Sequence, residues 1–294
     1  MIYLFLVNTG YWHSTFFHYS NAIIHYFKQN DINIIKINNI QNIKHDDYIL
    51  CFSDQFEQFK LYNFKNIILI QCENIFSKDK TQNIFNNNII KYQKNIKYII
   101  DYNYQNILGY KKLNLFVNKH IYIPLIYSPT YKIIYKNKRT KYDVFLYGGI
   151  NKRRKRLKNR IKSYLKKQLG KANVLFGQYY DDNVLLRKIK QSKIVIFCYS
   201  SNYHSSLDTY RCNLLLSNKI FFIHEKIDFD LFPDKKIKDN MIFSDYKDFP
   251  FICLKFLKMS QKERDEIAEK SYNYIKNNYS LDKTLLKNIF QKNV

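Results

Sequence analysis

The sequence lacks most of the short motifs that identify an enzyme class at once. It has no Walker-type phosphate loop, no Gly-x-Ser-x-Gly nucleophile turn, and no cluster of His, Cys and acidic residues with metal-ligand spacing. These absences disfavour a phosphate-loop nucleotidase, a serine hydrolase of that type and a dedicated metal enzyme. Glycine (6 residues) and proline (4 residues) are also scarce, while Asn, Lys and Ile are abundant. Since AT-rich coding produces this skew, it says little about the fold.

Cysteine pairs and long apolar runs are missing as well. The 5 cysteines are an odd number, are widely spaced and lie mostly inside apolar runs, with no CxxC pair. They are typical of buried free thiols in a reducing compartment, so we predict a cytoplasmic protein. The apolar stretch at residues 1–7 is too short to span a membrane, has no basic segment before it and ends at Asn8. It predicts a first core strand.

Positive charge is what the sequence has in excess. Lys and Arg outnumber Asp and Glu by 49 to 24, which gives a net charge of +25. Such a field attracts phosphates, polyanions and anionic membrane surfaces, so peripheral contact with a membrane is one expected consequence. Nucleic-acid binding is a competing hypothesis, but the Lys and Tyr residues are spread over the whole chain. We therefore expect no specific nucleic-acid partner; a well-solvated basic surface is the simplest alternative.

The length and the apolar pattern predict an α/β protein with two lobes. With 294 residues, 46% of them hydrophobic, the chain can form two cores of ordinary domain size. Short apolar runs alternate with helical stretches, the pattern of parallel sheets covered on both faces. Expected strands are residues 2–7, 32–37, 48–53, 67–70, 96–100, 119–123, 143–147, 173–176, 194–199, 220–224 and 241–243. Expected helices are residues 14–29, 152–168 and 261–278, with an amphipathic piece at 281–290.

A break in the pattern separates the two lobes. Two prolines within residues 123–129 interrupt both periods, and a polar, basic stretch follows at residues 132–141. The prediction is a Rossmann-like N-terminal lobe at residues 1–126, a second lobe at residues 127–280, and a C-terminal helix at residues 281–294 that packs back toward the first lobe.

The turn after the strand expected to end at Tyr147 is the most informative local feature. Gly148 and Gly149 open this turn, and Arg153 and Arg154 lie in the first turn of the helix that follows. Glycines let backbone amides approach a ligand, and a helix N-terminus suits a diphosphate. A cation at that position works against the helix dipole unless an anion is present. The segment predicts a phosphate site, and an ordinary turn followed by a solvated basic helix explains it equally well.

A second polar group opens the helix that precedes the strand at residues 220–224. It contains Tyr210, Arg211 and Asn213. This helix follows the strand expected at residues 194–199. Open α/β sheets bind ligands in the crevice at the carboxyl ends of their strands, so side chains at the start of the helix could face it. We predict that Arg211 and Asn213 donate hydrogen bonds to a phosphate or a ribose; a surface arginine and a local cap are equally good explanations.

Two residues of the first half are candidate general bases. His13 follows the turn after the first strand, and Glu73 follows the strand at residues 67–70. Both would point at a cleft between the lobes. A single His or Glu at a strand end is, however, more often a structural hydrogen-bonding residue.

Four segments of the second half occur together in an order typical of one family. They are residues 143–154 (DVFLYGGINKRR), 175–177 (LFG), 210–225 (YRCNLLLSNKIFFIHE), and a tail made of 241–246 (MIFSDY), 264–269 (RDEIAE) and 272–279 (YNYIKNNY). On these segments the chain resembles the C-terminal lobe of group-1-like GT-B glycosyltransferases, nearest the spore-coat glycosyltransferase-like family. The likeness covers about residues 143–285. The first half matches only in its strand–helix alternation and in its Ile-Pro-Leu break.

The resemblance implies a GT-B fold, in which two Rossmann-like lobes with parallel sheets face a cleft between them. It implies a hexosyltransferase-type enzyme whose donor is a nucleotide-diphosphate sugar and whose acceptor, a glycan, a protein or a small molecule, enters from the N-terminal lobe. No cofactor and no metal is expected, because helix N-termini and arginines can neutralise the leaving diphosphate. The implied donor-binding residues are Gly148, Gly149, Asn151, Arg154, Gly177, Gln178, Tyr210, Arg211 and Asn213.

One difference from the family affects the expected mechanism. Related retaining enzymes carry two glutamates eight positions apart, before a helix that ends in glycine; here Ser205, Asn213 and Asn218 occupy these three positions. The stereochemistry therefore stays open. In an inverting reaction His13 or Glu73 would deprotonate the acceptor hydroxyl. The alternative is a GT-B-like protein that binds its ligand without catalysis.

Overall fold

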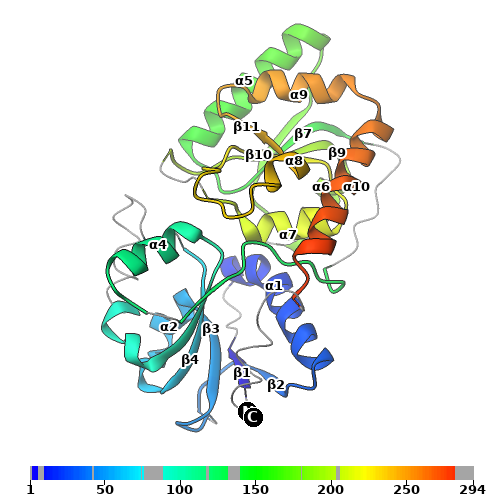
Figure 1. Cartoon of the computed structure of the whole chain (residues 1–294). Helices are drawn as coiled ribbons and strands as arrows, with labels where there is room; N and C mark the ends of the chain where they lie inside the picture. Colours follow the sequence, from blue (N-terminus) through cyan, green and yellow to red (C-terminus); the bar gives the residue numbers. More distant parts are fainter. Residues whose placement is uncertain are drawn as a thin grey trace. The chain divides into compact units, whose positions relative to one another are not determined.

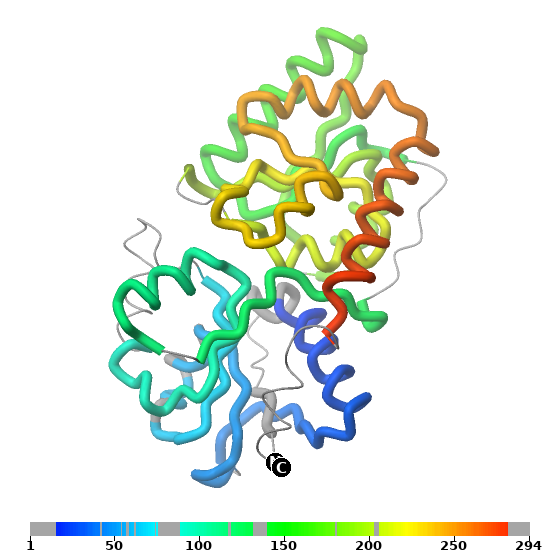
Figure 2. The backbone as a smooth tube through the Cα atoms, viewed as in Figure 1, coloured from blue at the N-terminus to red at the C-terminus, as the bar shows by residue number. Residues whose placement is uncertain are grey.

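The chain folds into two compact units. The computed structural model describes residues 2–5, 10–41, 43–73, 75, 89–116, 119–131, 140–179, 181–202 and 206–281. The first unit contains the described residues up to Thr130, together with Ser206–Tyr210 and the described residues from Tyr279 on. The second contains the described residues of Tyr131–Ser205 and Arg211–Asn278. Figure 1 labels their elements and Figure 2 traces the backbone through them.

The first unit is built on a six-stranded sheet with the order β2-β1-β3-β4-β5-β6. Its strands are β1 (Ile2–Phe5), β2 (Ile34–Ile37), β3 (Tyr48–Phe52), β4 (Asn66–Gln71), β5 (Ile96–Asp101) and β6 (His120–Tyr122). Every neighbouring pair is parallel. The sheet is accompanied by α1 (Gly10–Gln29), α2 (Ser53–Gln58), α4 (Tyr104–Lys112) and the 3-10 turns η1 (Leu61–Asn63) and η3 (Gln93–Asn95).

The second unit repeats this plan with five parallel strands in the order β11-β10-β9-β7-β8. The strands are β7 (Tyr142–Tyr147), β8 (Val174–Gly177), β9 (Ser192–Phe197), β10 (Phe222–Glu225) and β11 (Ile242–Ser244). The helices are α5 (Lys152–Leu169), α6 (Asp182–Lys190), α7 (Thr209–Ser217), α8 (Ile237–Asn240), α9 (Phe249–Lys258) and α10 (Gln261–Asn278). Helix α7 begins with residues of the first unit and continues in the second.

Each sheet reverses its strand order once. From β1 the chain moves to β2 on one side and then to β3 on the other; from β7 it moves to β8 and then to β9. In each sheet, the second and third strands therefore lie on opposite sides of the first strand. A crevice therefore opens at the carboxyl ends of β7 and β9, and this is where such sheets bind ligands.

The core of the second unit lies between its sheet and the helix pair α5 and α9, which pack against each other in the view of Figure 1. Leu157, Ile161 and Leu165 form one stripe of α5 at a spacing of four residues, and all three are fully buried. Burial of each such side chain stabilises the fold by about 1.5–3 kcal/mol. Gly170, with φ +75°, ends the helix in a conformation that favours glycine.

The predicted α/β class with parallel, Rossmann-like sheets is confirmed. The strands found agree with those expected within two residues over the described positions. Helix α1 begins at Gly10, earlier than the predicted residue 14. Gly10 was expected to belong to a turn before the helix and is instead its first residue. Helix α9 was not expected at all. The amphipathic piece at residues 281–290 lies outside the described residues except for Leu281, and the cleft between lobes and the lobe boundaries stay predictions.

Within the described ranges, no helix combines the length and the apolar character needed to cross a membrane. None of the 5 cysteines, all of which lie in the described ranges, forms a disulfide, and only Cys72 is not fully buried.

Candidate functional site

The carboxyl ends of β7 and β9 meet the first turn of α7 in the second unit. Tyr147 ends β7 and Phe197 ends β9, and the two strands are neighbours in the sheet. Arg211 places its guanidinium carbon 5.3 Å from the ring centroid of Tyr147 and 5.3 Å from that of Phe197. A guanidinium over an aromatic ring is held by cation–π attraction while its edge can still donate hydrogen bonds. Arg211 therefore lies at the crevice defined by the strand order.

Arg154 approaches the same aromatic ring from α5. Its guanidinium carbon lies 5.9 Å from the ring centroid of Phe197. The side chain is only 5% exposed; its Nε donates to the carbonyl oxygen of Cys198 at 2.7 Å and its Nη1 to that of Gly149 at 3.0 Å. Arg154 thus ties the turn after β7 to the end of β9. Both of these bonds are to the protein backbone, and the predicted role of Arg154 at the donor stays a prediction.

The glycines of the turn make room for these side chains. Gly148 has φ +147°, and a Cβ on it would lie 3.0 Å from the guanidinium carbon of Arg154. Both the backbone and the neighbour therefore require glycine. The amide of Gly148 donates to the carbonyl oxygen of Gly177 at 3.2 Å, so it is engaged within the sheet edge. At Gly149 a Cβ would lie 3.0 Å from Oε1 of Gln178, which brings that predicted residue to the same turn.

Asn151 forms the N-terminal cap of α5. Its Oδ1 accepts from the Arg154 amide at 2.9 Å, and its carbonyl oxygen accepts the first intrahelical bond from Lys155 at 2.9 Å. Its Nδ2 donates to the carbonyl oxygen of Ser200 at 3.4 Å, beyond the end of β9. The amides of Lys152 and Arg153 precede the helical ladder, and such amides bind anions at helix N-termini.

Arg153 has its anion inside the protein. Its guanidinium forms a two-pronged ion pair with Glu225: Nη1 donates to Oε2 at 2.8 Å and Nη2 donates to Oε1. The side chains are 14% and 9% exposed, and the ring of Tyr246 lies 4.0 Å from the guanidinium carbon. Burial is the largest single influence and lowers the pKa of Arg153, but the bonds to Glu225 together with the charges of Cys198, Glu225 and Tyr246 outweigh it and raise that pKa. The expected need for an anion at this first-turn arginine is therefore met by Glu225, without a phosphate.

The three polar residues expected together at the start of α7 have different surroundings. Only Arg211 lies at the crevice. Asn213 is fully buried near the hydroxyl of Tyr131. Tyr210 belongs to the first unit, where its hydroxyl donates to the carbonyl oxygen of Gln71 at 3.2 Å. Successive residues of a helix point about 100° apart, so neighbours in sequence need not share a site.

The carboxyl edge of the first unit is acidic. Glu73 follows β4, and its carbonyl oxygen accepts from Nδ2 of Asn106 at 2.9 Å. Tyr102 follows β5; burial raises its pKa most, and the charges of Glu73, Asp101 and Asp208 raise it further. The predicted base Glu73 therefore lies among other carboxyl groups. Asp208 comes to this edge from the short segment before α7.

Asp101, at the end of β5, is the most deeply buried of these carboxyl groups. Its Oδ1 accepts from the Asn103 amide at 2.8 Å and from Nδ2 of Asn106 at 3.2 Å. No residue that the structure describes hydrogen-bonds to its Oδ2. Burial raises the pKa of Asp101 to about 8. The group is thus mostly protonated at neutral pH.

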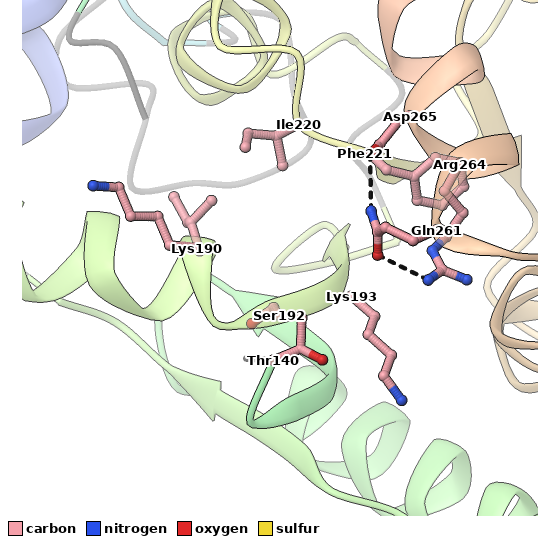
Figure 3. A pocket seen from close by; sticks show the side chains of 10 residues that line it. Thr140, Lys190, Ser192, Lys193, Ile220, Phe221, Gln261, Arg264 and Asp265 are labelled. Atoms are coloured by element: carbon pink, nitrogen blue, oxygen red, sulfur yellow. Dashed lines mark hydrogen bonds between the residues drawn. The ribbon is translucent and has the colours of Figure 1, made fainter. Parts of the chain in front are cut away.

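His13, the other candidate base, is part of α1, but its side chain lies outside the described residues. Among the residues described, no group of three or more His, Cys, Asp or Glu side chains is placed to hold a metal ion. A hollow of about 410 Å³ lies at the opposite, amino edge of the second sheet, lined by Thr140, Lys190, Gln261 and Arg264 among others (Figure 3). There Nη1 of Arg264 donates to the carbonyl oxygens of Phe256 at 2.9 Å and Met259 at 2.5 Å, at the end of α9.

Two doubly wound parallel sheets of this strand order are typical of the GT-B fold of glycosyltransferases, and the comparison with solved structures confirms that fold. A trehalose-6-phosphate synthase matches with a TM-score of 0.63 at 8% identity, over 100% of this chain and 99% of that one. The DNA-modifying enzyme β-glucosyltransferase matches with a TM-score of 0.60 at 12% identity, over 99% of this chain and 98% of that one.

TarM, an S. aureus protein, matches 92% of this chain with a TM-score of 0.59 at 15% identity. The chain spans 57% of the length of TarM. No protein-family model and no curated protein sequence matches the chain. At identities this low, the structural matches establish the fold of the chain and nothing more specific.

Proposed function

We propose that the chain is a glycosyltransferase that moves a hexose-type sugar from a nucleotide-diphosphate sugar to an acceptor hydroxyl. The observation that carries the proposal is the position of Arg211, over the rings that end β7 and β9 in a GT-B-fold unit. The N-terminus of α5 lies at the same edge of the sheet. A guanidinium and a helix N-terminus at one crevice suit the charge that develops on a leaving diphosphate.

The donor assignments follow from the same edge. The diphosphate is assigned to Arg211 and to the first amides of α5, beside the turn of Gly148 and Gly149. The base is assigned to the end of β8, at Gly177 and Gln178. Arg154 and Asn213 are buried, so in the proposal they hold the edge in shape. Two of the matching structures are described with UDP or with uridine diphosphoglucose, which makes a UDP-sugar the first donor to test.

The acceptor is assigned to the first unit, as a glycan, a protein or a small molecule. In the reaction the acceptor oxygen forms a bond to the anomeric carbon, the bond from that carbon to the diphosphate breaks, and the acceptor proton passes to a base. Glu73 and His13 are the proposed bases. Transfer without a metal, a cytoplasmic location and peripheral contact with an anionic membrane complete the proposal.

A binding panel followed by a turnover assay tests this function. UDP-, GDP-, dTDP- and CMP-sugars are added singly, and the temperature of unfolding is measured; a ligand that binds only the folded state must raise it. We expect one nucleotide-diphosphate sugar to stabilise the protein and to release free nucleotide diphosphate with an acceptor. Failure of all four donors to stabilise the chain would contradict the donor site.

A non-catalytic GT-B-like binding protein is the second candidate. It is favoured by Ser205, Asn213 and Asn218, which stand where related retaining enzymes carry two glutamates and a glycine. Stabilisation by a donor, without nucleotide release over a broad acceptor set, would support this candidate against the enzyme.

A further inference from the structure

Helix α5 is the most basic element of the chain. It carries four of the chain's eight arginines together with six lysines, and it contains no acidic residue. Two of these arginines, Arg153 and Arg154, are engaged inside the unit. A third, Arg160, donates from Nη2 to the carbonyl oxygen of Lys247 at 2.9 Å.

Six exposed cations remain on the outer side of α5, which we call the cationic face. None of them forms a side-chain hydrogen bond or ion pair with another residue that the structure describes. The cationic face consists of Lys152, Lys155, Arg156, Lys162, Lys166 and Lys167. Like charges four positions apart, as at Lys162 and Lys166, destabilise a helix unless an anion lies between them. The buried stripe of α5 holds the helix in place despite this repulsion.

Exposed apolar side chains lie beside the cationic face. In the described part of the second unit, the large apolar side chains that are exposed are Ile150 at 66%, Leu169 at 41% and Phe251 at 55%. Ile150 comes just before the cap of α5 and Leu169 is its last residue. Phe251 lies on α9, where its ring packs edge-on against Tyr164 of α5 with centroids 4.7 Å apart. The outer side of α9 adds two exposed lysines, Lys255 and Lys258.

We propose that the cationic face of α5 and the exposed side of α9 form a docking surface for an anionic phospholipid membrane. Cations at the headgroups of acidic lipids each add to the affinity, and apolar side chains beside them enter the headgroup–acyl boundary. A nucleic acid would neutralise the same cations but would leave Phe251 and Leu169 in water. The helix is about 27 Å long, which allows simultaneous contact with several lipids. This inference rests on the membrane contact proposed above and assigns it to one surface, and it does not depend on sugar transfer.

Vesicle flotation with the full chain tests the surface. Vesicles of phosphatidylcholine alone are compared with vesicles of phosphatidylcholine and phosphatidylglycerol. We expect binding only to the anionic vesicles, with an affinity that falls as salt is added. Replacement of Lys155, Arg156, Lys162 and Lys166 by Glu should lower the affinity by about a hundredfold or more, since each cation contributes several-fold.

A matched variant separates this surface from net charge. Glu replaces Lys44, Lys65, Lys94 and Lys112, exposed lysines of the first unit, so the charge changes by the same amount. We expect this control to keep most of the binding. Phe251→Gln should weaken binding by about tenfold while leaving its salt dependence unchanged. Circular dichroism and the temperature of unfolding confirm that each variant is folded.

Three outcomes would overturn the proposal. They are equal losses in the two four-residue variants, equal binding to neutral and anionic vesicles, and binding to duplex DNA that exceeds vesicle binding and is insensitive to Phe251→Gln. The last outcome would identify the cationic face as a nucleic-acid surface.

Discussion

The two sheets of this chain share a strand order but differ in the chemistry of their carboxyl edges. At the edge of the second unit Arg153 pairs with Glu225, while Arg154 and Arg211 lie against the ring of Phe197. The edge of the first gathers carboxyl groups and tyrosines around Asp101. The topology therefore fixes where a site lies, while the residues at the strand ends decide what it can bind.

The edges also tolerate buried charge in different ways. In the second unit the buried side chains of Arg153 and Glu225 satisfy each other through two charge-assisted hydrogen bonds. In the first unit no cation among the described residues pairs with Asp101, and its raised pKa lets it avoid the charge by keeping its proton. The stability of the second unit should therefore depend on keeping both members of the pair, whereas the stability of the first unit should depend on pH.

The largest effect is expected when the pair in the second unit is broken. Glu225→Leu leaves Arg153 buried without its carboxylate and should lower the free energy of unfolding by about 3–5 kcal/mol. The double variant Arg153→Met with Glu225→Leu should recover most of that loss, because no unpaired charge remains. Urea unfolding measures both variants. A single variant as stable as the parent would show that the pair is not a buried one in solution.

Removal of the crevice arginine tests the donor assignment of the same edge. Arg211→Ala should lower kcat/KM by about 10²–10³-fold, because an interaction with the leaving diphosphate is lost, while the temperature of unfolding stays near that of the parent. Arg187→Ala, at an exposed position of α6, is the matched control and should keep full activity. Near-parental activity of Arg211→Ala would count against the donor assignment.

The first unit should respond to pH through Asp101. Its pKa rises from 3.8 in the unfolded chain to about 8 in the fold, so the folded state holds a proton that the unfolded state releases. Stability is then fully present below about pH 4 and is lost as pH rises toward 8, by at most about 1.4 kcal/mol per pH unit. Asp101→Asn keeps an oxygen for the Asn103 amide and should flatten this slope. Urea unfolding from pH 5 to 8 compares the two; identical slopes would refute the buried proton.

The smallest effect should distinguish the adjacent glycines of the turn. Gly148→Ala places a side chain at φ +147° and against Arg154, and should cost about 1–3 kcal/mol of stability. Gly149→Ala meets only the flexible end of Gln178 and should cost less. Thermal unfolding of both variants gives the difference, and a larger loss at Gly149 would contradict the described turn.

The sequence predicted the strands well because buried parallel strands are short continuous apolar runs, such as residues 67–70 in β4. It missed α9, since that helix is a short and largely apolar run of 10 residues, which is hard to distinguish from a buried strand. The strand-end rule selected Arg211 and Gly148 as candidates. It could have selected Glu225 and Asp101 as well, because each directly follows an expected strand.

The sequence pattern could not predict which residues far apart in the chain contact each other in the fold. Arg153 and Glu225 are 72 positions apart, and nothing local links them. The expected role of Asn213 depended on which way a helix faces, and its burial against Tyr131 appears only once the helix is packed. Local chemistry therefore indicates candidates, and tertiary packing decides which of them reach the crevice.

The pair of Arg153 and Glu225 has a consequence for engineering. It reaches from the helix after β7, across β9, to the end of β10, and so braces three strands at once. An edge braced in this way needs little ordering when a ligand arrives. Gln178 and Tyr179 lie beyond β8, on the other flank of β7, outside the brace. In the proposed donor site, substitutions at these two positions should therefore change which nucleotide base is preferred while the brace stays intact.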